Sequence, residues 1–157
     1  MSTTDLVGST QDEHEISRLL IRWGHARDSG DWQTLSACFH DGATIHLSWI
    51  SGSARDFVAR SRAMAGVRKS GTHMKHVTSG SWIQVNRDRA FSRSHVTLFA
   101  RTFIDRHEFD LQSWFRFFDL PERRNGVWGI VKRTAVYEKD RIDPVDPRGV
   151  PKDLFAE

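Results

Sequence analysis

The spacing of apolar positions changes from a helical to a strand-like pattern about halfway along the chain. Between residues 16 and 23, Ile, Leu and Trp recur three or four positions apart, which indicates the buried face of an α-helix. Thr10 and Glu13 have the spacing of a capping box, and Gly30 is a typical residue to end a helix. We therefore predict a first helix over residues 11–29, preceded by a loose arm.

Two shorter helices and one strand are expected next. Asp31 can cap a second helix, and Ser53 with Asp56 can open a third. Between these two helices, residues 40–43 (HDGA) have the composition of a turn, and residues 44–49 (TIHLSW) alternate as in a short strand.

The second half of the chain is expected to consist of strands. Four extended segments cover residues 73–86, 89–104, 109–120 and 126–138, and the turn sequences NRDR, IDRHE and ERRNG separate them. ERRNG between two aromatic-rich segments is a strong hairpin signal. The proline-punctuated tail over residues 141–157 is predicted to be irregular.

Helices followed by a run of strands predict an α+β domain, with helices packed on one face of a curved antiparallel sheet. The chain of 157 residues suits a single domain, with its core over about residues 10–140. The order argues against a nucleotide-binding α/β fold, in which strands and helices alternate, and neither a G-x-G-x-x-G nor a P-loop motif occurs. Because SHVTLFARTF and DLQSWFRFFDL carry large residues on both faces, we expect a homodimer or higher homo-oligomer through the sheet.

Composition narrows the partners and the compartment. The net charge is only +3, and no basic stripe with interleaved aromatic residues occurs, so we expect no nucleic-acid partner. The only cysteine, Cys38, lies in an apolar stretch and is expected to be a small buried residue, which fits a reducing compartment. The sequence shows no secretory signal and no apolar run of ~18 residues, so we predict a cytoplasmic protein without a membrane partner.

Three features of the sequence could carry chemistry: Asp28, the histidines His73 and His76, and Arg133. Asp28 lies two helical turns after Ile21, with Gly24 between them, and is either a half-buried functional carboxylate or a residue at the helix rim. His73 and His76 are three residues apart on a predicted strand, so their side chains point to opposite faces and do not form a metal pair. We expect no metal site. The residues alone favour a surface position for each histidine.

Arg133 is the third position. It shares a strand face with apolar neighbours, and therefore either pairs with a buried carboxylate or a ligand or reaches solvent at a strand edge. Phe, Trp and Met side chains are expected to line a pocket for a hydrophobic substrate. Weaker candidates for this pocket are Trp23, His25, Trp49 and Tyr137.

Three stretches together resemble a known family. They are RWGHARDSGDWQTLSACFHDGAT, HVTSGSWIQVNRDRAFSRSHV and NGVWGIVKRTAVYEKD. In this order and spacing, over about residues 10–140, the chain resembles the SnoaL-like group of the nuclear-transport-factor-two-like superfamily. The resemblance implies a cone-shaped curved antiparallel sheet with three N-terminal helices packed on its concave face.

The enzymatic pattern that fits best is that of hexachlorocyclohexane dehydrochlorinase, with scytalone dehydratase and bile-acid dehydratase more distant. Such enzymes eliminate HX or water from hydrophobic rings without a cofactor. The resemblance implies that His76 is the base, Asp28 its carboxylate partner and Arg133 an active-site arginine. Two positions depart from the pattern: Trp23 stands where these enzymes often have Tyr or Lys, and Gly80 stands where a small polar residue is common.

The sequence therefore predicts a cofactor-independent lyase or isomerase, dehydratase-like or dehydrohalogenase-like, that acts on a small hydrophobic, aromatic or polycyclic substrate. An imidazole, whose unperturbed pKa is about 6.5, suits proton abstraction at neutral pH, and a carboxylate at one ring nitrogen stabilises the imidazolium. Arg133 could stabilise negative charge that develops on a leaving group or an enolate oxygen. The alternatives are a non-catalytic ligand-binding or assembly domain of the same fold, and a protein like the small subunit of ring-hydroxylating oxygenases.

Overall fold

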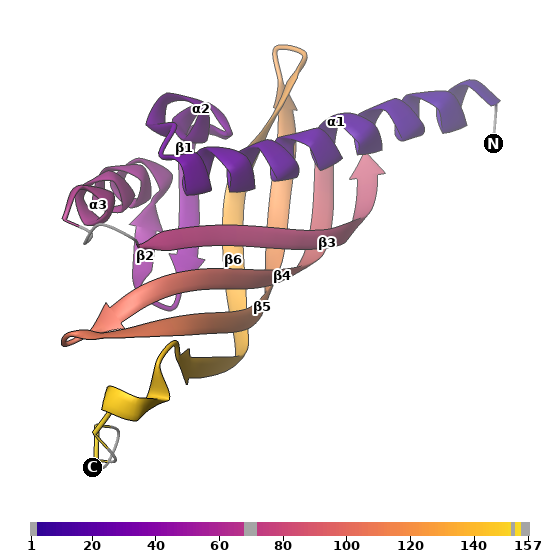
Figure 1. Ribbon diagram of the computed structural model, residues 1–157. Coiled ribbons are helices and arrows are strands. Elements are labelled where there is room, and N and C mark those ends of the chain that lie inside the picture. The colour runs from indigo at the N-terminus through magenta and orange to yellow at the C-terminus, as the bar shows by residue number, and fades with distance from the viewer. Residues whose placement is uncertain (1–2, 68–71, 152, 155–157) are drawn as a thin grey trace.

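The fold is three helices on one face of a six-stranded curved sheet (Figure 1). The computed structural model describes residues 3–67, 72–151 and 153–154. The helices are α1 (Thr3–Ser29), α2 (Trp32–Ala37) and α3 (Ala54–Gly66). The strands are β1 (Phe39–Leu47), β2 (Ile50–Ser53), β3 (His73–Asn86), β4 (Arg89–Ile104), β5 (His107–Arg124) and β6 (Val127–Pro144), and a 3₁₀ turn follows at Pro147–Gly149.

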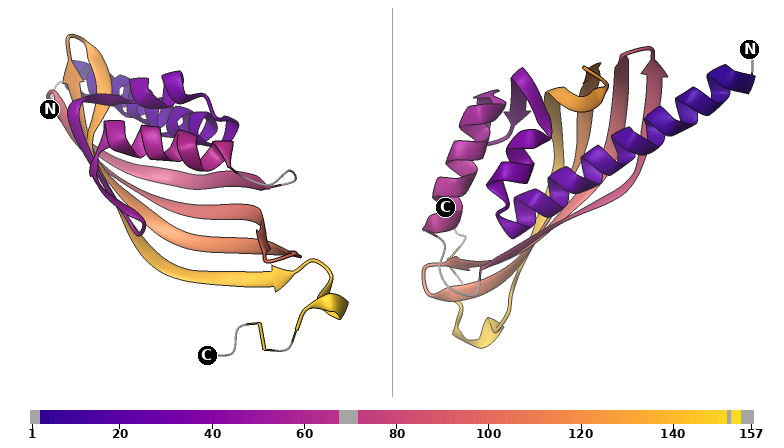
Figure 2. Two further views of the ribbon diagram at one scale, coloured as in Figure 1. Left: turned by 90° about the vertical axis from the view of Figure 1, so that its left-hand side faces the viewer. Right: turned by 90° about the horizontal axis from the view of Figure 1, so that it is seen from above.

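The strands follow the order β2-β1-β6-β5-β4-β3 across the sheet. From β3 to β6 each strand pairs antiparallel with its neighbour in sequence, as the alternating pattern predicts. The sheet curves around the helices, which lie on its concave face (Figure 2). The expected α+β cone is therefore confirmed.

Asp31 and Ser53 cap the N-termini of α2 and α3, as the sequence predicts. The Asp31 carboxylate accepts a hydrogen bond from the Thr34 backbone N–H at 3.0 Å, and the Ser53 hydroxyl accepts one from Asp56 N–H at 3.0 Å. Both bonds are made within one turn, so the local sequence is sufficient to specify them.

Besides strand β2, which was not predicted, four predicted boundaries or pairings were clearly wrong. Helix α1 begins at Thr3, so the expected loose arm is largely helical, and Thr10 lies inside the helix instead of capping it. Residues 40–43, expected as a turn, belong to β1; the turn-like composition reflects a bulge there, with Gly42 at φ +79° and a register shift before Thr44. β6 continues to Pro144, beyond the expected end at residue 138.

The fourth difference is the pairing of β1. This strand runs parallel to β6, so the sheet is mixed and not wholly antiparallel. Parallel pairing requires a long connection, and here α3 with β3, β4 and β5 supplies it. Sequence patterns within one strand do not specify the direction of a partner that lies 90 residues away.

The core lies between α1 and the concave face of the sheet. Apolar side chains of α1 at Ile16, Leu19 and Trp23 are buried against sheet residues such as Ile130. Cys38 is fully buried in the same core, as expected, and burial raises the pKa of its thiol. In the part of the chain described, no helix is long and apolar enough to cross a membrane.

Candidate functional site

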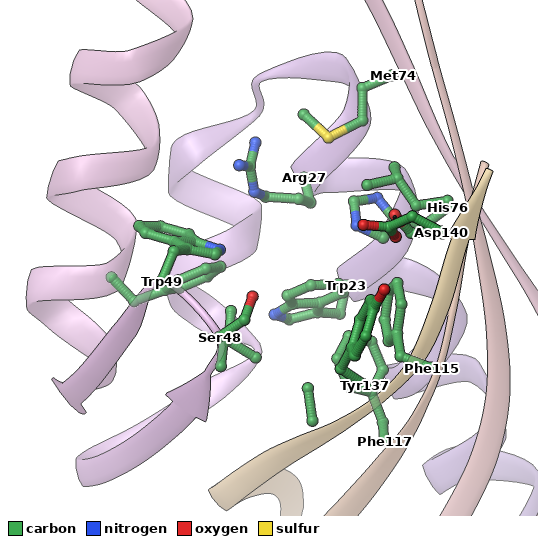
Figure 3. A pocket seen from close by; sticks show the side chains of 15 residues that line it. Trp23, Arg27, Ser48, Trp49, Met74, His76, Phe115, Phe117, Tyr137 and Asp140 are labelled. Atoms are coloured by element: carbon green, nitrogen blue, oxygen red, sulfur yellow. Dashed lines mark hydrogen bonds between the residues drawn. The ribbon is translucent and has the colours of Figure 1, made fainter. Parts of the chain in front are cut away.

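A cavity of about 430 Å³ lies between the helices and the concave face of the sheet (Figure 3). Aromatic side chains form much of its wall: Trp23 comes from α1, Phe57 from α3, and Phe115 and Phe117 from β5. Trp49, in the turn between β1 and β2, stands on the opposite side. An apolar cavity with few polar groups is the usual form of a site for a small organic molecule.

His76 lines this cavity, and the Asp28 carboxylate accepts two hydrogen bonds from it. Asp28 Oδ1 accepts from His76 Nδ1 at 2.5 Å, and Asp28 Oδ2 accepts from the backbone N–H of His76 at 2.6 Å. The side chain of His76 is only 9% exposed and that of Asp28 only 17%. A single carboxylate therefore fixes both the main chain and the ring of His76.

The close approach of α1 to β3 makes this contact possible. Asp28 lies in the last turn of α1, and β3 is one of the two edge strands of the sheet, so its backbone has N–H groups that no further strand pairs. Gly24, one turn earlier in α1, faces the histidine: a Cβ atom there would lie 3.9 Å from His76 Cβ.

The geometry determines where the ring can take up a proton. Because the carboxylate accepts from Nδ1–H, the lone pair of the neutral imidazole lies on Nε2. The ring also contacts Trp23 edge-on, with centroids 5.6 Å apart and planes at 79°. His76 thus has one tautomer, a fixed orientation and a place in the cavity wall.

The structure separates the two histidines as the strand alternation predicts. His73 is exposed, whereas His76 faces the cavity. Among the described residues, no group of three or more His, Cys, Asp or Glu side chains could hold a metal ion.

Three of the four candidate pocket residues, Trp23, Trp49 and Tyr137, line the cavity together with His76. His25 does not: its side chain is exposed on α1, because it lies two residues after Trp23 and thus on another side of the helix.

Arg133 reaches neither the cavity nor solvent. Its Nε and Nη2 donate to the Asp119 carboxylate at 2.6 and 2.9 Å, and both side chains are buried. The guanidinium carbon lies 4.2 Å from the ring centroid of Trp23 and 4.0 Å from that of Phe117. Of the alternatives that the sequence left open for Arg133, the structure shows the pairing with a buried carboxylate. Arg133 packs behind Trp23 and Phe117, two residues of the cavity wall.

Sequence reasoning gave no role to three polar residues of the cavity wall, Arg27, Ser48 and Ser113. Arg27 lies four residues after Trp23 on the buried face of α1, so helical spacing could have revealed it. Asp140 accepts a hydrogen bond from Ser113. These two residues meet through the pairing of β5 with β6, whose register shifts at two points that the turn sequence does not specify.

A small α+β cone with a carboxylate-held histidine in an apolar cavity defines the class of the protein. The family model of the SnoaL-like domain matches residues 8–134. The chain belongs to the SnoaL-like domain family.

The relatives are fungal. Pea pathogenicity protein 2 from Fusarium vanettenii is 34% identical over 149 residues, which cover 90% of this chain and 63% of that protein. The chain spans about three fifths of the length of the curated relatives that it matches.

Solved structures show the same fold at low sequence identity. A scytalone dehydratase-like protein from Novosphingobium aromaticivorans is 20% identical, with a TM-score of 0.72 over 97% of this chain and all of that chain. LinA is 19% identical, with a TM-score of 0.72 over 96% of this chain and 97% of that chain.

Proposed function

We propose that the protein is a cofactor-independent lyase or isomerase that abstracts a proton from a small hydrophobic substrate. The observation that carries the proposal is the two-point contact of Asp28 with His76 at the wall of an apolar cavity. Membership in the SnoaL-like family, whose members include dehydratases and isomerases, supports the same reaction class.

In this proposal His76 Nε2 takes the proton and Asp28 stabilises the imidazolium that forms. The carboxylate already accepts from Nδ1–H, so no rearrangement is needed when positive charge appears on the ring. The aromatic walls strengthen this charge pair relative to water, because the effective dielectric constant inside the cavity is lower. The protonated ring can afterwards return the proton to a leaving group or to another carbon.

Two observations favour this reaction over a non-catalytic binding or assembly domain of the same fold. A ligand-binding domain needs no histidine fixed in one tautomer, and an assembly domain needs no open cavity beside it; both features are present. A role like that of an oxygenase small subunit would require a stable partner chain, which pull-down from the native host would reveal.

The test measures proton abstraction without knowledge of the natural leaving group. The probe is 1-tetralone, an apolar bicyclic ketone, and the rate of exchange of its α-hydrogens in D₂O is followed by NMR. We expect His76→Ala and Asp28→Asn to lower the catalysed exchange rate by ~10²–10⁴-fold, the usual contribution of a positioned base.

His73→Ala is the matched control, since it removes a histidine from the same strand but from the opposite face. Circular dichroism and thermal unfolding verify that each variant folds. An unchanged exchange rate in folded His76→Ala protein would contradict the proposal.

A further inference from the structure

The indole nitrogen of Trp23 is a polar group of the cavity wall that the proposed proton transfer does not use. The Trp23 side chain is 2% exposed, and its Nε1–H has no hydrogen-bond partner among the residues that the structure describes. Its ring lines the cavity beside His76. Buried N–H groups are normally paired, so an unpaired one in a cavity wall points to an acceptor that a ligand brings.

Packing holds the Trp23 ring in one orientation. It stacks on Phe57 at a centroid distance of 5.9 Å and 15° between planes, and it meets Phe117 edge-on at 5.3 Å. The guanidinium of Arg133 lies against the ring, and the Asp119 carboxylate holds that guanidinium in turn. The indole therefore cannot turn its N–H toward another partner without breaking these contacts.

The free N–H and the proposed base belong to the same cavity. Figure 3 shows the nitrogen edge of Trp23 turned toward Ser48 and Trp49, away from Phe115 and Tyr137. Another edge of the same indole contacts the ring of His76, with 5.6 Å between centroids. A ligand about as large as one or two fused rings can thus accept from Trp23 and present a C–H group to His76.

We propose that Trp23 Nε1–H donates a hydrogen bond to a ligand oxygen, and that the site therefore selects a hydrophobic ring compound that carries a carbonyl group. An indole N–H only donates, so it cannot bind an ammonium or another pure donor. The cavity wall contains both a basic and an acidic side chain, Arg27 and Asp140, so the selection rests on the indole N–H and not on a net charge of the cavity.

This inference rests on the proposed function, because it gives Trp23 a part in the same step. When the C–H bond next to the carbonyl breaks, its proton goes to His76 Nε2 and its electron pair passes to the carbonyl oxygen. A donor placed at that oxygen stabilises the enolate more than the neutral ketone, which is the condition for lowering the barrier.

The experiment follows the indole N–H signals of the six tryptophans in ¹H–¹⁵N spectra. Trp23→Phe identifies the Trp23 signal by its absence, and NOEs to Phe57 identify it independently if that variant does not fold. We expect 1-tetralone to shift the Trp23 N–H proton signal downfield, as a new hydrogen bond does, and tetralin, which has the same rings without the oxygen, not to produce this downfield shift.

The affinities of the two compounds give a second readout. We expect Trp23→Phe to bind 1-tetralone about tenfold more weakly, equivalent to about 1.4 kcal/mol, and to bind tetralin as the wild type does. Trp82→Phe, on the outer face of the sheet, is the matched control and keeps the wild-type preference for 1-tetralone.

A Trp23 signal that 1-tetralone at millimolar concentration does not shift would overturn the inference, as would equal affinity of Trp23→Phe and wild type for 1-tetralone. The two proposals fail separately. Loss of the Trp23 shift with His76-dependent exchange intact contradicts only the role of Trp23, whereas a Trp23 shift with exchange that does not depend on His76 contradicts only the proposed reaction.

Discussion

At the scale of single residues, two carboxylates organise the site. Asp28 fixes the main chain and the ring of His76, and Asp119 fixes Arg133 behind the ring of Trp23. The second pair is wholly buried, so the charge of each partner is compensated mainly by the other. Asp28 and His76 are 48 positions apart and depend on the packing of α1 against β3, whereas Asp119 and Arg133 lie opposite each other in the β5–β6 hairpin and depend on its register.

We expect Asp119→Asn to lower the free energy of unfolding by about 3–5 kcal/mol, because it leaves the guanidinium of Arg133 buried without a compensating charge. Urea unfolding measures the change through the transition midpoint at constant slope. The matched control is Asp143→Asn, which removes a carboxylate paired with Arg141 on the surface and should change the midpoint much less. Equal losses in the two variants would show that burial of the pair is unimportant.

At the scale of elements, the contact of α1 with β3 brings Asp28 and His76 together. The edge strand β3 presents the His76 backbone N–H to the last turn of the helix, and Gly24 faces the His76 side chain without a side chain of its own. The same contact covers part of the exposed edge of the sheet.

Two substitutions at Gly24 test this contact. Gly24→Ala adds a methyl group at an ordinary van der Waals distance and favours the helix, so we expect the free energy of unfolding to rise by up to about 1 kcal/mol. Gly24→Leu places a larger group where the His76 side chain lies, and should lower both thermal stability and the rate of 1-tetralone exchange. Wild-type exchange in Gly24→Leu would contradict the close approach of α1 to β3.

At the scale of the whole molecule, the convex face of the sheet carries exposed apolar side chains that take no part in the candidate site. Trp82 and Phe99 are 51% and 42% exposed there, and Arg93 lies over the Trp82 ring at 5.5 Å. The helices cover only the concave face (Figure 2), so the apolar residues on both faces of β4 and β5 still lack an explanation within one chain.

The expectation of a homo-oligomer through this face therefore stays a prediction. We expect size-exclusion chromatography with light scattering to give a dimer or larger assembly, and the double variant Trp82→Glu, Phe99→Glu to give a monomer. Val67→Glu, an exposed position at the end of α3, is the control and should leave the assembly unchanged. A monomeric wild type would contradict the prediction.

Much of the fold follows from the sequence by itself, because it depends on local periodicity. Helical spacing indicates the buried face of α1, alternation places His73 and His76 on opposite faces of β3, and the caps at Asp31 and Ser53 act within a single turn. The family resemblance adds Asp28 as the partner of His76.

The tertiary structure decided the rest. The Asp28–His76 contact joins residues 48 positions apart, and the partner of Arg133 lies across a strand pair at Asp119. The parallel pairing of β1 with β6 and the place of Asp140 in the cavity wall depend in the same way on strand register and sheet curvature. Such contacts arise from the packing of distant segments, and so the sequence pattern of one segment does not contain them.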